Sequence, residues 1–201
     1  MDRKSTQPFS VKQWMLFTSL GWILGVVLIL LLAELSEAFA VTIDFPLGVG
    51  LGLGIGFMQW LVLRKYVETS FKWIGLTVLG LSFPFVLYDI CSQLFCIPEI
   101  WLFLNFGIGG VVSGYLQYRF FLIALSKKSK CWLWYSFYAW CLCLLLNSFP
   151  FIPYYQQLKK STKDIINIIT IFGSGPLFGL ITGMGMVIIL RAINNNSFDK
   201  K

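Results

Sequence analysis

The residues with the most scope for chemistry are polar side chains that fall inside or beside long apolar stretches. Gln59 and Gln117 lie toward the ends of two apolar runs, and Arg119 follows Gln117 by two residues. An amide in hydrocarbon needs a partner, because lipid offers no hydrogen bonds. The two glutamines therefore predict either a small polar site or hydrogen bonds that join helices, and we favour the second interpretation.

Two charged residues belong to the same group of candidates. Arg119 would extend to the membrane interface, contact a lipid phosphate or pair with an acidic residue. Asp89 follows Tyr88 at the end of a run, where it most simply ends a helix, with a functional role as the alternative.

Several chemistries are excluded by residue type. The chain has no histidine, which removes Ser-His-Asp and Cys-His catalysis and histidine-ligated haem or zinc. Cys91 and Cys96 permit a disulfide on an oxidising side, but their spacing is not the C-x-x-C of thiol redox sites. Cys131, Cys141 and Cys143 lie in an apolar run and are interpreted as small apolar residues. We expect no catalytic residue, cofactor or metal site.

Composition points to a membrane rather than to water. Of 201 residues, 57% are hydrophobic and 12% charged, against about 25% charged in soluble domains. The net charge of +7 comes from basic clusters between apolar runs, a placement that suits lipid headgroups better than nucleic acid. The expected partners are the lipid bilayer, other membrane proteins or a second copy of this chain.

Six apolar runs predict an all-α fold of six transmembrane helices, because a lipid-embedded backbone must bond to itself. The membrane domain is expected over residues 14–191, between tails at 1–13 and 192–201. The spans are expected at about 14–33, 47–65, 71–90, 99–124, 131–149 and 165–190. The first run is long for a cleaved signal peptide and is interpreted as a retained helix.

Orientation follows from the basic residues. If the spans alternate in direction, 13 of the 16 lysines and arginines fall on one side, which we assign as cytoplasmic. Both termini then lie in the cytoplasm. Lys159, Lys160 and Lys163, in the last outer loop, are the exception.

The odd-numbered spans begin alike. Trp14, Trp73 and Trp132 follow one another at intervals of 59 residues, each preceded closely by a lysine. The even-numbered spans share glycines at every fourth position, and Gln59 and Gln117 occupy equivalent places. These coincidences predict three parallel copies of a two-helix unit.

Glycine every fourth residue predicts close helix packing. The expected packing residues are Gly48, Gly52, Gly56, Gly110, Gly114, Gly175, Gly179 and Gly183. We expect the three helices that carry them to meet around a central axis, with the odd-numbered helices outside.

One stretch resembles a known pattern. Residues 56–64 read G-F-M-Q-W-L-V-L-R and are followed by Lys72-Trp73. This is similar to a loose group of uncharacterised bacterial membrane proteins, frequent in cyanobacteria and some Gram-positives, with helices that end in G-x-x-Q-W-x-x-L-R before a tryptophan-rich helix. The match covers two clear copies and one degenerate copy, and Met186 and the segment 119–122 depart from it. The resemblance implies a bacterial inner-membrane location and no particular activity.

Two functions compete at this point. The first is a non-enzymatic accessory, assembly or scaffold component of the membrane, supported by the glycine faces and the few buried charges. The second is a small-solute transporter, channel or substrate-binding membrane subunit, supported by size and helix number. A lipid-modifying enzyme finds no support, because no acidic pair or nucleophile constellation occurs.

Overall fold

The computed structural model describes residues 9–38, 43–95, 98 and 100–198, with side chains described as far as Ile193. Within those residues the fold is all-α, as predicted. The helices are α1 (Val11–Ala38), α2 (Phe45–Leu63), α3 (Lys72–Leu94), α4 (Ile100–Phe120), α5 (Cys131–Leu146), α6 (Pro153–Gln156) and α7 (Lys160–Phe198). Short 3-10 turns are η1 (Leu122–Ala124), η2 (Lys127–Lys130) and η3 (Phe149–Phe151).

Among the described residues, five helices are long and apolar enough to cross a membrane, which indicates a multi-pass membrane protein. These are α1, α2, α3, α4 with its η1 extension, and α7. The remaining long element, α5, has 16 residues and spans about 24 Å at 1.5 Å per residue, less than the ~30 Å hydrocarbon core.

The fifth predicted span ends earlier than expected. The helix was expected to reach Phe149, but α5 stops at Leu146, and Asn147 takes the C-cap position. Pro150 and Pro153 then sit in the first turns of η3 and α6, where a missing N–H costs least. The chain then turns back as α7, which begins at Lys160. Lys160 and Lys163, two of the three lysines that depart from the orientation rule, therefore lie in the first turn of this helix.

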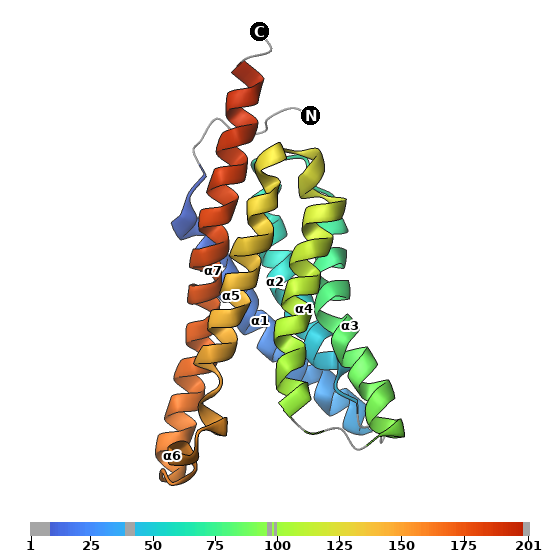
Figure 1. Ribbon diagram of the computed structural model, residues 1–201, viewed down its shortest axis with the longest axis vertical. Coiled ribbons are helices and arrows are strands. Elements are labelled where there is room, and N and C mark those ends of the chain that lie inside the picture. The colour runs from blue at the N-terminus through green and yellow to red at the C-terminus, as the bar shows by residue number, and fades with distance from the viewer. Residues whose placement is uncertain (1–8, 39–42, 96–97, 99, 199–201) are drawn as a thin grey trace.

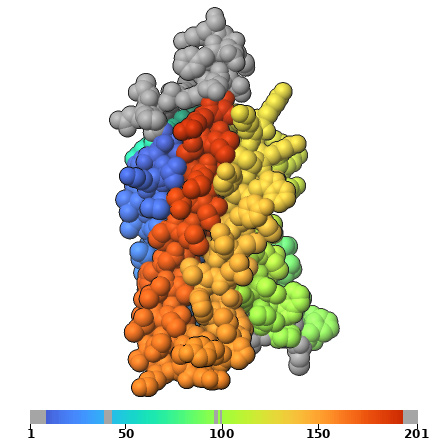
Figure 2. Space-filling view, turned by 60° about the vertical axis from the view of Figure 1, so that its left-hand side comes forward, coloured from blue at the N-terminus to red at the C-terminus, as the bar shows by residue number. Residues whose placement is uncertain are grey.

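The long helices pack in chain order, and the last returns to the first (Figure 1). Each of α1 to α4 contacts its successor, α5 contacts α7, and α7 contacts α1. Figure 2 shows α7 lying between α1 and α5 over the visible face. We call the end where α1 begins and α7 ends the basic end, defined by Lys12, Arg64, Lys72, Lys130 and Arg191, and the other the opposite end.

The glycines pack helices together, but not as expected. A Cβ on Gly48 or Gly52 would strike the backbone of α3, and one on Gly175 or Gly179 would crowd α1. A Cβ on Gly110 would overlap the Trp140 ring of α5. The predicted packing glycines of α2 therefore face α3, those of α4 face α5, and those of α7 face α1. The expectation that the three glycine faces meet one another at a central axis is wrong.

The outer surface of the helices is apolar. On α1, Leu16, Leu20, Ile23, Leu30 and Leu31 are all more than two-fifths exposed. Equivalent exposed leucines, isoleucines and phenylalanines occur on α3, α4, α5 and α7. A soluble protein rarely exposes apolar surface on this scale, and lipid is the solvent that suits it.

Candidate functional site

Three tryptophans occupy the centre of the molecule near the basic end. The side chains of Trp14, Trp73 and Trp132 are 0–1% exposed. Their ring centroids lie 5.6–6.5 Å apart in tilted, edge-to-face pairs, an arrangement that suits the charge distribution of aromatic rings. The indoles of α1, α3 and α5 therefore fill the space between these three helices.

The two predicted glutamines hold these indoles in place. The Gln117 side-chain oxygen accepts from Trp132 Nε1 at 3.0 Å, while its Nε2 donates to Thr77 Oγ1 at 2.9 Å. Gln59 repeats the pattern more loosely, accepting from Trp73 Nε1 at 3.3 Å and donating to Thr18 Oγ1 at 3.4 Å. Both amides are 2–3% exposed.

In the third unit Met186 stands at the glutamine position, and Thr182, one turn earlier on α7, accepts the bond from the indole. Trp14 Nε1 donates to Thr182 Oγ1 at 3.0 Å, and this hydroxyl donates to the Phe178 carbonyl. Met186, one turn farther along α7, is fully buried among the tryptophans. A threonine can therefore satisfy the indole without an amide, and the bond joins α7 back to α1.

The rest of the G-x-x-Q-W-x-x-L-R stretch has packing roles. Trp60 stacks on Phe71 at 4.7 Å between centroids, and the Arg64 guanidinium lies 4.9 Å from the Trp60 ring. Leu63 is fully buried in the core around the three tryptophans. The stretch thus ties the end of α2 to the start of α3.

Arg119 lies apart from the glutamines. Its side chain is exposed, and its guanidinium lies 6.0 Å from the Phe120 ring. Gln117 faces inward on the same helix. The structure therefore does not bring Arg119 into a common polar site with the two buried amides.

Asp89 is at the opposite end, where it caps α2. Its two carboxylate oxygens accept from the backbone N–H groups of Asp44 and Phe45 at 2.8 and 2.9 Å. A carboxylate there satisfies free N–H groups and faces the positive end of the helix dipole. Partial burial, and then the nearby charge of Asp89, raise the pKa of the Asp44 carboxyl above its ordinary value.

The cysteines fall in different places. Cys91 is half-buried near the end of α3, and Cys96 lies outside the described residues, so their pairing stays a prediction. Cys131 and Cys141 are half-buried and Cys143 is buried in α5. In the part of the chain that the structure describes, no three His, Cys, Asp or Glu side chains gather as a metal site would need.

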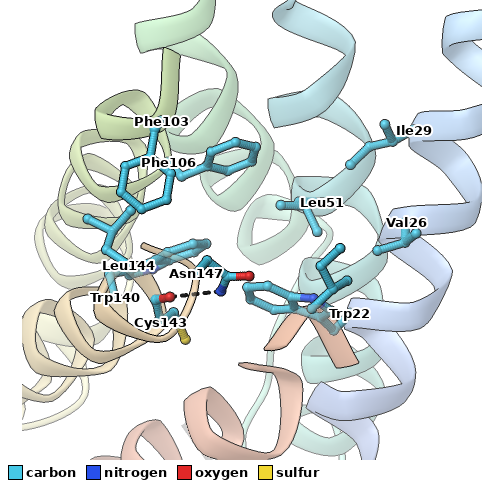
Figure 3. Close-up of a pocket in the computed structure, with 11 residues that line it drawn as sticks. Trp22, Val26, Ile29, Leu51, Phe103, Phe106, Trp140, Cys143, Leu144 and Asn147 are labelled. Carbon is cyan, nitrogen blue, oxygen red and sulfur yellow. Dashed lines mark hydrogen bonds between the residues drawn. The ribbon is translucent and has the colours of Figure 1, made fainter. Parts of the chain in front are cut away.

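An apolar cavity of about 290 Å³ lies toward the opposite end (Figure 3). Its walls come from α1, α2, α4, the end of α5 and α7. The lining residues are Trp22, Val26, Ile29, Leu51, Phe103, Phe106, Trp140, Cys143, Leu144, Asn147 and Ile171. None of the four residues predicted as a polar site lines it.

Asn147 is the functional candidate that sequence reasoning missed. Its Nδ2 donates to the Cys143 carbonyl and to Ser174 Oγ, both at 2.8 Å. The available signal was an amide directly after the apolar run of α5, shortly before Pro150. Asn105 of α4 is a buried amide whose Nδ2 has no hydrogen-bond partner among the described residues.

Comparison with protein-family models, with curated proteins and with solved structures finds no match.

Proposed function

We propose that this chain is a six-span inner-membrane protein, built from three parallel two-helix repeats, that serves as a non-enzymatic accessory or scaffold component. Both termini lie on the cytoplasmic side in this proposal, at the basic end. The repeats are α1 with α2, α3 with α4, and α5 with α7. The resemblance of residues 56–64 to bacterial membrane proteins supports the location.

The equivalence of contacts supports the repeat. Trp14, Trp73 and Trp132, spaced 59 residues apart, each donate an indole hydrogen to the second helix of another unit. The acceptors lie on α7, α2 and α4, respectively. Within two of the units, a glutamine donates to a threonine of its own odd-numbered helix. These shared contacts are hard to explain by chance similarity of apolar sequence.

The closed core is the single observation that carries the accessory role. Near the basic end the axis is filled by three indoles, and the two buried glutamines both use their hydrogen bonds on neighbouring helices. A polar passage would need side chains left over to face a solute. The glutamines therefore serve as structural joints, which suits a rigid membrane component better than a conduit.

The test combines purification with a flux measurement. The full-length protein, isolated from its native membrane in mild detergent, should carry a defined membrane partner at fixed stoichiometry. The same protein in liposomes should not accelerate the escape of trapped small solutes or ions. Isolation without a partner, together with saturable solute uptake by the liposomes, would contradict the proposal.

A second candidate is a membrane subunit that binds a substrate without conducting it. The cavity at the opposite end favours this role, since it has room for a ligand, whereas three indoles fill the axis near the basic end. Stoichiometric binding of a small ligand, with no flux by the isolated chain, would support this second candidate.

A further inference from the structure

The cavity is built to hold an apolar body. Four aromatic rings and several aliphatic side chains line it, and Asn147 supplies its only side-chain amide. Its volume of about 290 Å³ lies near the lower end of small-molecule sites, which start at roughly 300 Å³. It is also well above the ~150 Å³ of an engineered apolar cavity that binds benzene.

Aromatic packing closes the inner end of the cavity. Trp22 and Trp140 lie 5.9 Å apart, and both contact Phe178, at 6.3 and 4.9 Å between centroids. Asn147 is seven residues beyond Trp140, or about 10 Å farther along the axis at 1.5 Å per residue. The cavity is therefore closed by Trp22 and Trp140 at its inner end and has the Asn147 amide near its outer opening.

The amide presents an acceptor to this cavity. Both Nδ2 hydrogens of Asn147 are engaged, by the Cys143 carbonyl and by Ser174. Among the residues that the structure describes, none donates to Oδ1, and Figure 3 shows this oxygen directed across the cavity toward Trp22. An acceptor held in this orientation selects a ligand group with a hydrogen to donate, such as a hydroxyl.

A lipid-facing groove adjoins the cavity. It runs between α4 and α5, has a volume of about 410 Å³ and shares Trp140 and Leu144 with the cavity wall. The Leu144 side chain occupies the space left by the missing side chain of Gly107, since a Cβ on Gly107 would overlap it. Leu144 and Trp140 therefore separate the groove from the cavity, and hydrocarbon chains are what this groove meets in a bilayer.

We propose that this cavity binds a single-chain amphiphile, with its hydrocarbon chain against Trp22 and Trp140 and its hydroxyl donating to Asn147 Oδ1. The ligand enters sideways from the membrane between α4 and α5. The inference rests on the membrane placement in the proposed function but not on the accessory role. A long-chain or isoprenoid alcohol, free or carried in a lipid, has the required chemistry.

Photolabelling of the full-length protein in phosphatidylcholine liposomes tests the site. The probe is dodecan-1-ol with a diazirine at mid-chain, and labelled residues are located by mass spectrometry. Labels are expected on Val26, Leu144 and their neighbours in the cavity wall. Dodecan-1-ol should compete for these labels about fivefold better than 1-methoxydodecane, the factor that one hydrogen bond supplies.

Paired substitutions separate the cavity from the lipid surface. Val26→Trp fills the cavity and should abolish labelling of its wall. Val27→Trp, one residue along and 47% exposed on the lipid side, should leave that labelling unchanged. Asn147→Leu should make the alcohol and the ether equal competitors. Ser174→Ala removes a hydroxyl that accepts from Asn147 Nδ2 and donates to the Thr170 carbonyl; because it leaves Asn147 Oδ1 in place, it should preserve the preference for the alcohol.

Each outcome is decisive. Unchanged cavity labelling in Val26→Trp, or labels confined to lipid-facing residues, would overturn the proposal while leaving the membrane placement intact. Equal competition by alcohol and ether in the unaltered protein would overturn the role of Asn147. The absence of labels even on exposed residues such as Leu30 would instead contradict the membrane placement itself. A phospholipid-borne alcohol competing better than dodecan-1-ol would identify the lipid as the source.

Discussion

The indole nitrogen of Trp132 donates to the side-chain oxygen of Gln117 at 3.0 Å, and this bond joins α5 to α4 in the buried centre of the molecule. The same glutamine donates to Thr77 on α3. One amide thus joins three helices. The Thr77 hydroxyl in turn donates to the Trp73 carbonyl, and the Trp73 indole donates to Gln59, so the two glutamines belong to one chain of hydrogen bonds.

Replacing Gln117 by leucine should destabilise the protein. The change leaves Trp132 Nε1 buried without an acceptor, at a cost of about 1 kcal/mol in a membrane interior. Gln59→Leu should cost less, because its bonds of 3.3 and 3.4 Å are longer. Thermal unfolding in detergent, followed by circular dichroism, measures both, with the exposed Gln157→Leu as control. Equal stability of Gln117→Leu and Gln157→Leu would refute the structural role of the amide.

Gly179 should tolerate no side chain. A Cβ there would lie 2.8 Å from the Met15 Cα on α1, so Gly179→Ala must push α7 away from α1. Gly173 on the same helix has only the end of Leu146 nearby, at 3.9 Å, and its replacement by alanine should be neutral or stabilise by up to ~1 kcal/mol. The ranking of the two melting temperatures checks the packing, and a reversed ranking would contradict it.

Asp89→Ala should weaken the start of α2. It removes two charge-assisted hydrogen bonds to backbone N–H groups, and the loss of a helix cap costs about 1 kcal/mol. Asp164→Ala, an exposed acidic residue at the same end, should have little effect. Hydrogen exchange of the first turn of α2 should accelerate in the first variant alone; protection unchanged by Asp89→Ala would count against the cap.

Asp44 should make stability depend on pH. Its pKa is raised in the folded state by burial and by Asp89, so the folded protein holds this proton more tightly than the unfolded chain. Stability therefore falls as pH rises from 3.8 through the folded pKa, and the penalty persists above it. Asp44→Asn should raise the melting temperature at neutral pH, and its advantage should shrink below pH 3.8. An advantage independent of pH would show another cause.

Much of the architecture could be predicted because lipid imposes a simple rule on the backbone. Uncharged runs located the helices, and spacing directed attention to Gln59, Gln117 and the three tryptophans, two of which the structure joins to the glutamines by hydrogen bonds. The helix that each glycine face contacts was harder to predict, because closely spaced glycines indicate tight packing but do not identify the neighbouring helix. The glycines contact α1, α3 and α5, since the indoles of these helices are large enough to fill the axis.

The cavity could not be predicted from sequence in the same way. Its walls come from five helices, and its volume reflects how α5 ends at Leu146 and diverges from α4 (Figure 1). Asn147 is the C-cap of α5, inside the predicted fifth span of 131–149, and only its two bonds to Cys143 and Ser174 show which atom remains to face a ligand. Apolar pattern alone does not distinguish a lined cavity from a filled core.

We propose that six helices cross the membrane, and α5, with 16 residues, is the shortest of them. Epitope insertions after Gln93, Lys128 and Gln157, probed in sealed cells and in permeabilised cells, test it directly. We expect the sites after Gln93 and Gln157 to be accessible from outside, and the site after Lys128 to be accessible only after permeabilisation. Accessibility of Lys128 and Gln157 from the same side would contradict it.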